Sequence, residues 1–350
     1  MDINSIFGKR LNQARLIKGI TMEELAQSVH PTVTRQAINK YEKGQSMPDS
    51  GMLISLGMAL GVKPDYFFRP FTVEVSKVMF LKKSRFSKKE ATSVKEKVRE
   101  ELERYLEIEQ LCGSESDYTL ENLTVANDKD AANAANTIRI QLGLGIDGIS
   151  NVIEVLEDNG IKIIEIAEDD SFEGLSGYAN DNIPLIVINS GLGYEHKRFT
   201  LLHELGHLVM RFGENASPKQ IEDLCDIFAS ELLVPSTVLT MRLGKNRHDI
   251  SLSELTDIQK QFGISIDLLM AALNRNEIIT NRRYNGYLKK KKCYPDFRVL
   301  VEKSFSIPET SGRFARMVYR ALADEIISLS KAAVLLNTSV DKVKNKLQLV

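Results

Sequence analysis

The chain has 350 residues, enough for two or three domains, and its 43% hydrophobic and 27% charged residues are ordinary for a globular protein. The net charge of −1 combines a basic part with an acidic part: residues 1–100 hold 18 Lys and Arg against 10 Asp and Glu, whereas the remainder holds 28 against 37, so we expect a nucleic-acid partner for the first part only. Three cysteines far apart exclude a disulfide framework. The sequence has no signal-peptide pattern at its start and no apolar run of membrane-spanning length. We therefore expect a cytoplasmic protein with no membrane partner.

Residues 1–70 have the pattern of a small helical bundle that presents one polar helix. Thr21 and Glu24 have the spacing of a capping box at the start of one short helix. Thr34 is placed to cap the next helix, which is closed by Gly44. The outward side chains of that helix are of the types that pair with guanine, adenine or phosphate, although a solvated polar face is the alternative. We predict DNA contacts from Thr34, Arg35, Gln36, Asn39 and Lys40.

This pattern resembles the helix-turn-helix domain of Xre/Cro-type repressors. The resemblance rests on residues 21–26, 34–38 and 41–44 and extends over most of residues 1–70. It implies binding to a double-stranded DNA operator, and we expect a homodimer because such proteins read two half-sites. The turn before Thr34 is longer than in the family, and Met22 stands where the family usually has Gln.

Residues 71–130 are predicted to connect two domains. The basic run at residues 82–89 is interpreted as a solvated linker, with an added contact to DNA phosphate as the alternative. Residues 88–111 carry an apolar stripe at helical spacing, which predicts a helix that acts as a spacer or as a dimer seam. The polar residues 113–130 are predicted to form a loop at the domain boundary.

Residues 131–275 are predicted to form an α+β domain. We expect a peptide to be able to add as an extra strand beside the strand that ends at Asn189. The elements expected before the central motif are helices at residues 131–142 and 149–159, strands at 161–166 and 185–189, and a tight hairpin at 174–178.

The central motif is His-Glu-Leu-Gly-His at residues 203–207, set among apolar residues. Positions four apart share a helix face, so His203 and His207 can bind one Zn²⁺. Glu204 can then take a proton from a water that the metal acidifies. An accidental pair of buried His is the less favoured interpretation, because the chain has only five His. The motif predicts a zinc peptidase with Glu204 as its catalytic base.

A catalytic zinc site needs a third protein ligand. The helix expected after the motif carries Glu222 and Asp226 four residues apart, and therefore on one face. We predict that Glu222 binds the metal and that Asp226 orients one of the ligand imidazoles from behind. Asp223 and Glu231 are the alternatives for the third ligand.

These residues resemble the ImmA/IrrE family of zinc metallopeptidases. The resemblance implies His203 and His207 as metal ligands and Glu204 as the base. Many members have Glu-Ala-Asn where this chain has Leu224, Cys225 and Asp226, which transfers the third-ligand role to Glu222. The matching segments are residues 177–179, 184–189, 198–207, 226–229 and 232–235.

Residues 276–350 are predicted to form a helical C-terminal extension. Its basic patches at residues 282–283 and 289–292 are placed in a loop-like region, before a helical stretch at 312–327 and two short helices. We interpret the extension as a packing or dimerisation cap, with a second DNA reader as the alternative.

The sequence thus predicts a multidomain protein: an all-α helix-turn-helix bundle, an α+β zincin-like metallopeptidase domain and a helical extension. The function predicted is that of a DNA-binding transcriptional regulator whose zinc-dependent endopeptidase cleaves a repressor-type protein, which is itself, a sister subunit or a partner. One alternative is a non-catalytic regulator whose zincin-like domain senses a ligand or partner. The other is a toxin–antitoxin fusion.

Overall fold

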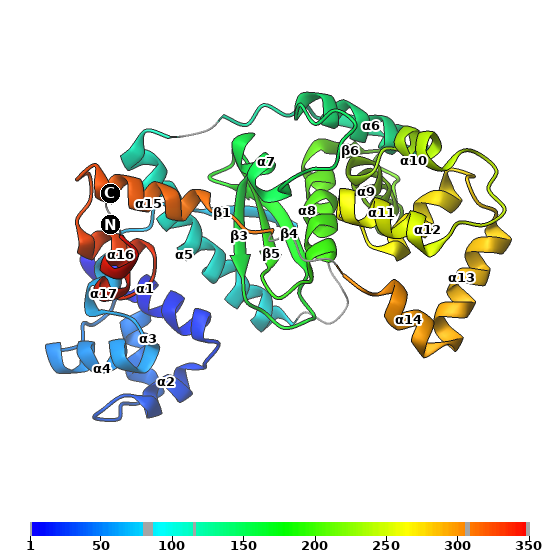
Figure 1. Cartoon of the computed structure of the whole chain (residues 1–350). Coiled ribbons are helices and arrows are strands. Elements are labelled where there is room, and N and C mark those ends of the chain that lie inside the picture. The colour runs from blue at the N-terminus through cyan, green and yellow to red at the C-terminus, as the bar shows by residue number, and fades with distance from the viewer. Residues whose placement is uncertain (1, 80–86, 115–116, 305–308, 348–350) are drawn as a thin grey trace. The chain divides into compact units, whose positions relative to one another are not determined.

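The computed structural model describes residues 2–79, 87–114, 117–304 and 309–347 (Figure 1). The chain forms two compact units, one made of residues 1–107 with 179–181 and the other of residues 108–178 with 182–350. The division falls inside helix α5 (Lys88–Cys112), within the predicted connector. Residues 82–86 of the predicted basic run lie outside the described part of the chain.

The first unit is a helical bundle built on α1. Its core is formed by side chains such as Phe7, Leu25 and Ile38, each fully buried. A Cβ at Gly8 would lie 2.5 Å from the carbonyl oxygen of Glu42, so the absence of a side chain lets α1 approach α3 closely. The elements are α1 (Ile3–Lys18), α2 (Met22–Ser28), α3 (Arg35–Glu42), α4 (Ser50–Leu60), the 3-10 helix η1 (Pro64–Phe68), strand β1 (Val75–Met79) and the first part of α5.

Two polar contacts hold this bundle together. Arg15 on α1 forms an ion pair of 2.5 Å with Glu42 on α3. Arg10, also on α1, pairs with Glu103 of α5 at 2.8 Å, and its guanidinium stacks 3.9 Å from the ring centre of Phe71. The first part of α5 therefore packs on the bundle as one of its helices.

The second unit surrounds a small sheet in which β5 (Ile183–Asn189) lies between β4 (Gly174–Ala179) and β3 (Lys162–Ile166). Strands β3 and β5 are parallel, with Ile164 opposite Val187. Helix α8 (Tyr194–Val209) packs against β5, and α9 (Pro218–Leu233) packs against both α8 and α6 (Asp128–Gln141). The remaining elements up to residue 275 are β2 (Leu123–Val125), α7 (Val152–Asp158), β6 (Met210–Phe212), α10 (Ser236–Leu243), α11 (Leu252–Phe262) and α12 (Ile266–Arg275).

The C-terminal extension is helical, as predicted. It contains α13 (Asn281–Cys293), α14 (Pro295–Val301), α15 (Arg313–Ala323), α16 (Leu329–Leu335) and α17 (Val340–Lys346). The helical first part and the mixed second part confirm the predicted multidomain fold class. In the residues that the structure covers, no single helix is long and apolar enough to cross a membrane; α9 and α10 meet that criterion only when taken together, and they are bent by 54°.

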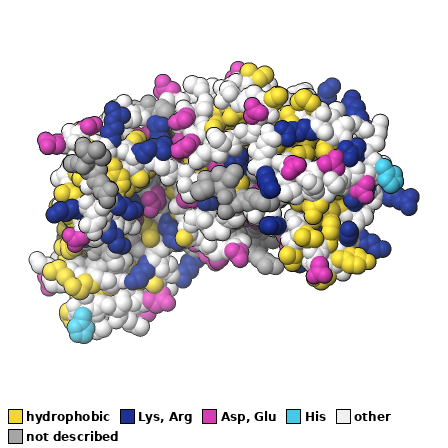
Figure 2. Space-filling view, viewed as in Figure 1, with side chains coloured by type: hydrophobic (Ala, Val, Ile, Leu, Met, Phe, Trp, Pro, Cys, Tyr) yellow, Lys and Arg dark blue, Asp and Glu magenta, His cyan; other side chains and the backbone are white. Residues whose placement is uncertain are grey.

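Three local predictions are wrong. The loop expected at residues 113–130 includes strand β2 and the start of α6. Residues 174–178 form strand β4 instead of a tight hairpin, and the chain reverses at Asn180 and Asp181, which have φ of 46° and 65°. Gly174 is needed because a Cβ there would lie 2.9 Å from Thr200 on α8. The basic residues 282–292 belong to helix α13, which begins with Thr280 as its cap, and not to a loop. Lys and Arg side chains are exposed over this part of the surface (Figure 2).

The prediction that a peptide can add as a strand beside β5 is also wrong. Because β5 has a strand on each side, it offers no free edge to a peptide. Asn189 at its end is buried, and its side-chain amide donates hydrogen bonds to the carbonyl oxygens of Glu168, Asp169 and Phe172. This residue therefore holds the loop between β3 and β4 and has no donor to spare for a substrate.

Candidate metal centre and nucleic-acid interface

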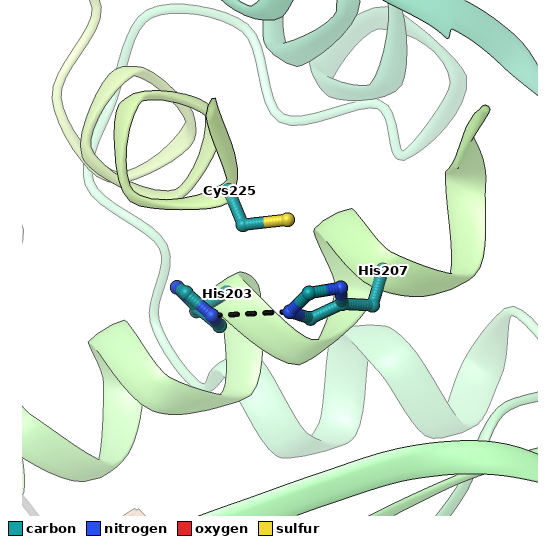
Figure 3. A group of neighbouring side chains, drawn as sticks. All are labelled: His203, His207 and Cys225. Carbon is teal, nitrogen blue, oxygen red and sulfur yellow. Dashed lines mark hydrogen bonds between the residues drawn. The ribbon is translucent and has the colours of Figure 1, made fainter. Parts of the chain in front are cut away.

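Helix α8 presents its two motif histidines on the face that packs toward α9. Both imidazoles are buried, and their Nε2 atoms are 3.2 Å apart, with the rings pointing toward one another (Figure 3). The apolar residues of the same helix, Leu201, Leu202, Leu205 and Leu208, are buried in the core of the second unit. The sequence produces this arrangement because the two histidines are four residues apart, about one helical turn, in the mostly apolar second half of the helix.

Helix α9 brings two carboxylates to these imidazoles. Oε2 of Glu222 lies 3.3 Å from Nε2 of His203, and its Oε1 lies 3.6 Å from Nε2 of His207. One turn later, Oδ1 of Asp226 accepts a hydrogen bond of 2.8 Å from Nδ1 of His203. Asp226 thus orients the imidazole so that its Nε2 faces Glu222.

The two alternative carboxylates occupy other positions on α9. Asp223 is exposed. Glu231 is buried, and its Oε1 accepts hydrogen bonds of 2.8 Å from the backbone N–H and the hydroxyl of Ser236, at the start of α10. Its geometry is that of a helix cap. The assignment of Glu222 as third ligand nevertheless stays a prediction.

One residue of this cluster was missed by the sequence analysis. The thiol of Cys225, also on α9, lies with the two imidazoles in a group whose donor atoms are all within 4.8 Å of one another (Figure 3). Its position three residues after Glu222 gave a signal, because residues three apart share a helix face. Disulfide and Cys-x-x-Cys patterns, by contrast, give no signal for a single cysteine on a helix.

The two histidines have opposite electrostatic environments. Burial disfavours the charged form of His203, but its hydrogen bonds to Asp226 and Glu222 prevail and raise its pKa to about 9. Burial lowers the pKa of His207 to about 4, and the charge on His203 acts in the same direction. Burial raises the pKa of Glu204 to about 7, against the opposing effect of His203. Without a metal, His203 therefore carries a proton at neutral pH and shares it with His207.

The donor set fits a tetrahedral metal ion. Ligand atoms about 2.0–2.1 Å from one zinc ion are separated by roughly 3.3 Å. The Nε2 atoms of His203 and His207 are 3.2 Å apart, and they lie 3.3 and 3.6 Å from Oε2 and Oε1 of Glu222, respectively. Glu204 is fully buried beside them, and neither of its oxygens has a hydrogen bond of regular geometry, although Ser176 lies close enough to lower its pKa. An unpaired buried carboxylate next to two imidazoles is the environment that a cation would satisfy.

The predicted DNA-contacting residues lie on α3 and at its cap. The Thr34 hydroxyl accepts from the backbone N–H of Ala37 and so begins the helix. The side chains of Arg35, Gln36 and Lys40 are exposed, whereas Asn39 is partly buried. Their role in DNA contact stays a prediction.

Met22 and the long turn have structural roles in this domain. Met22 is partly buried and packs against the core of the bundle. The turn between α2 and α3 is held by a hydrogen bond from the N–H of Val33 to the carbonyl of Ala26. A surface depression next to α3 is lined by Met22, Glu23, Val33, Thr34, Arg35, Gln36 and Asn39.

Comparisons with known proteins agree with both parts of the structure. A family model described as helix-turn-helix matches residues 11–67, and a peptidase model described as IrrE N-terminal-like domain matches residues 156–274. The chain is 38% identical to an uncharacterized HTH-type transcriptional regulator of Rickettsia conorii over 66 residues, which cover 19% of this chain and 51% of that protein. It is 36% identical to an SPbeta prophage-derived HTH-type regulator, YonR of Bacillus subtilis, over 64 residues, which cover 18% and 57%.

The chain spans about half the length of these curated relatives, and the matches cover less than a fifth of this chain. The helix-turn-helix domain implies binding to double-stranded DNA. The peptidase model implies a metal ion. The chain therefore joins an Xre-type helix-turn-helix domain to an IrrE/ImmA-like peptidase domain.

Proposed function

We propose that this protein is a DNA-binding transcriptional regulator that binds zinc through His203, His207 and Glu222 and cleaves a repressor-type protein. One observation carries the proposal: the two imidazole Nε2 atoms of α8 lie 3.2 Å apart and 3.3 and 3.6 Å from the two carboxylate oxygens of Glu222 on α9, beside the buried carboxylate of Glu204. A purely structural ion pair gives no reason to bury the carboxylate of Glu204 without a hydrogen-bond partner. A hydrolytic site does, because its general base must be available to the attacking water.

The chain's own residues supply positioning and proton transfer. Zinc, when bound, acts as a Lewis acid that acidifies water and polarises a carbonyl group. Glu204 takes the proton of the attacking water and passes it to the leaving amine. Its pKa, raised to about 7 by burial, is close to the operating pH, where a general base is most efficient. Asp226 fixes the ring of His203 through Nδ1 and so leaves Nε2, on the side of Glu222 and His207, available to a metal ion.

The fusion of the two activities restricts the choice of substrate. A peptidase that is covalently attached to a DNA-binding domain is held close to the other proteins bound at the same operator. This linkage raises the effective concentration of those proteins at the peptidase domain. We infer that the substrate is a sister copy of this chain or a repressor at the same site. The protein would act as a homodimer, since helix-turn-helix domains read two half-sites.

The proposal is tested by comparing wild-type protein with Glu204→Gln in host cells and mapping new protein N-termini by mass spectrometry. Glu204→Gln keeps the size of the side chain and the ligand set but removes the base. We expect new N-termini within one repressor-type protein, or within this chain, only in the wild type. In vitro, zinc-loaded wild type is mixed with a tagged Glu204→Gln copy to detect cleavage between sister chains. Identical sets of N-termini in both strains, with zinc bound, would exclude the peptidase function.

A further inference from the structure

The thiol of Cys225 lies beside the candidate metal-binding nitrogens of His203 and His207. It is completely buried, and its sulfur lies within 4.8 Å of the ring nitrogens of His203 and His207 (Figure 3). It follows Glu222 by three residues on α9, so the thiol and the carboxylate approach the imidazoles from one helix face. A buried cysteine usually acts as a small apolar side chain. The thiol of Cys225 instead lies next to two imidazole nitrogens.

The packing of α9 on α8 holds the thiol in this place. Gly206 lies between the two histidines, and a Cβ at this residue would be 3.4 Å from the sulfur of Cys225. The same Cβ would be 3.2 Å from the ring of Phe228 and 3.1 Å from the methyl group of Met210. The side chain of Cys225 therefore rests directly on the turn of α8 that links His203 to His207.

A second observation points to a cation at the same position. The two oxygens of Glu204 are buried next to His203 and lack hydrogen bonds of regular geometry. Burying a carboxylate in that state is costly, and a metal cation bound to the neighbouring imidazoles would offset that cost. Imidazole nitrogen, carboxylate oxygen and thiolate sulfur are together the ligand types that zinc takes in proteins.

We propose that Cys225 is a zinc ligand and that, with His203, His207 and Glu222, it completes a four-donor site. This inference rests on the proposed zinc site and adds a means of regulation. A zinc ion with four protein ligands has no open position for water, so the peptidase is latent until one ligand leaves. Glu222 is the ligand that can leave, because its side chain is 41% exposed whereas Cys225 is enclosed.

X-ray absorption spectroscopy at the zinc edge of the full-length, zinc-loaded protein tests this inference directly. We expect one sulfur neighbour at about 2.3 Å together with nitrogen and oxygen neighbours at about 2.0–2.1 Å. The sulfur contribution should be lost in Cys225→Ala, in which nitrogen or oxygen replaces it. Cys293→Ala is the matched control, because Cys293 is exposed on α13, and this variant should keep the sulfur contribution.

If Cys225→Ala does not fold, the spectra of the wild type and of Cys293→Ala still test the inference, because loss of the sulfur contribution in Cys293→Ala would overturn it. Bound zinc with only nitrogen and oxygen neighbours would overturn the role of Cys225 and leave the proposed peptidase site in place. A sulfur neighbour that persists in Cys225→Ala would also overturn it. A wild-type protein that binds no zinc would overturn this inference and the proposed function together.

Discussion

Replacing Glu309 tests how the C-terminal extension is attached to the motif helix. Glu309 accepts a hydrogen bond of 2.6 Å from Arg198 on α8 and one of 2.9 Å from the backbone N–H of Ile153 at the start of α7. Both charged side chains are completely buried. Removing one partner of such a pair costs about 3–5 kcal/mol, because the other charge is left unpaired.

The expected effect of Glu309→Ala lies at the lower end of that range. Arg198 keeps a hydrogen bond of 2.6 Å to the carbonyl of Ile149, which still satisfies part of the guanidinium. We therefore expect a loss of about 3 kcal/mol of stability in the second unit. Glu309→Gln keeps an acceptor for Arg198 and should lose somewhat less stability, although it also leaves the guanidinium charge unpaired.

Hydrogen exchange followed by mass spectrometry is the suitable assay. The chain has no Trp, and two units do not unfold in a single two-state transition, so one denaturation curve would mix them. A loss of about 3 kcal/mol corresponds to a roughly hundredfold decrease in the protection of the α7 and α8 amides.

The control lies in the same extension. Asp324 pairs with Arg320 at the surface, where the two side chains are 54% and 79% exposed, and Asp324→Ala should change the stability by less than about 0.5 kcal/mol. If Glu309→Ala and Asp324→Ala leave α7 and α8 equally protected, the buried pair does not attach the extension, and the argument from burial fails.

Three further outcomes are expected. Glu222→Gln should bind zinc more weakly than the wild type in competition with a chelator, because one ligand is lost, whereas Asp223→Asn, the exposed neighbour, should bind it as tightly as the wild type; equal affinities would contradict the assignment of Glu222 as a ligand. Zinc affinity should fall as the pH falls below about 9, since the metal must displace the proton that the raised pKa places on His203, and calorimetry in two buffers should show proton release at neutral pH. Gln36→Ala should reduce discrimination between operator and mutated operator by about 1–3 kcal/mol, whereas Lys40→Ala should weaken binding to all sequences and reduce the salt slope by about 1; the reverse pattern would exclude α3 as the reading helix.

Local patterns in the sequence predicted the parts of the site that depend on one helix. The four-residue spacing of His203 and His207 is sufficient to bring their nitrogens together, and Glu222 and Asp226 reach one face of α9 for the same reason. The capping box at Thr21 could also be read directly, because it involves residues three apart.

Features that depend on how elements pack could not be predicted in this way. The approach of Cys225 to the imidazoles requires the register of α9 on α8, which is set at Gly206. The pair of Arg198 with Glu309 joins residues that are 111 positions apart. The hairpin expected at residues 174–178 is a strand, and its Gly174 leaves space for Thr200 on α8.

The placement of the metal site therefore depends on contacts outside the motif. His203 follows Arg198 by little more than one turn of α8, so the buried ion pair with Glu309 fixes the part of the helix from which the first imidazole projects. The Nδ1 atom of His203 is held by a hydrogen bond to Asp226 on α9. One imidazole is thus constrained by the C-terminal extension and by the helix that supplies the carboxylate and the thiol. A change in either element would move His203 relative to His207 without altering any residue of the motif.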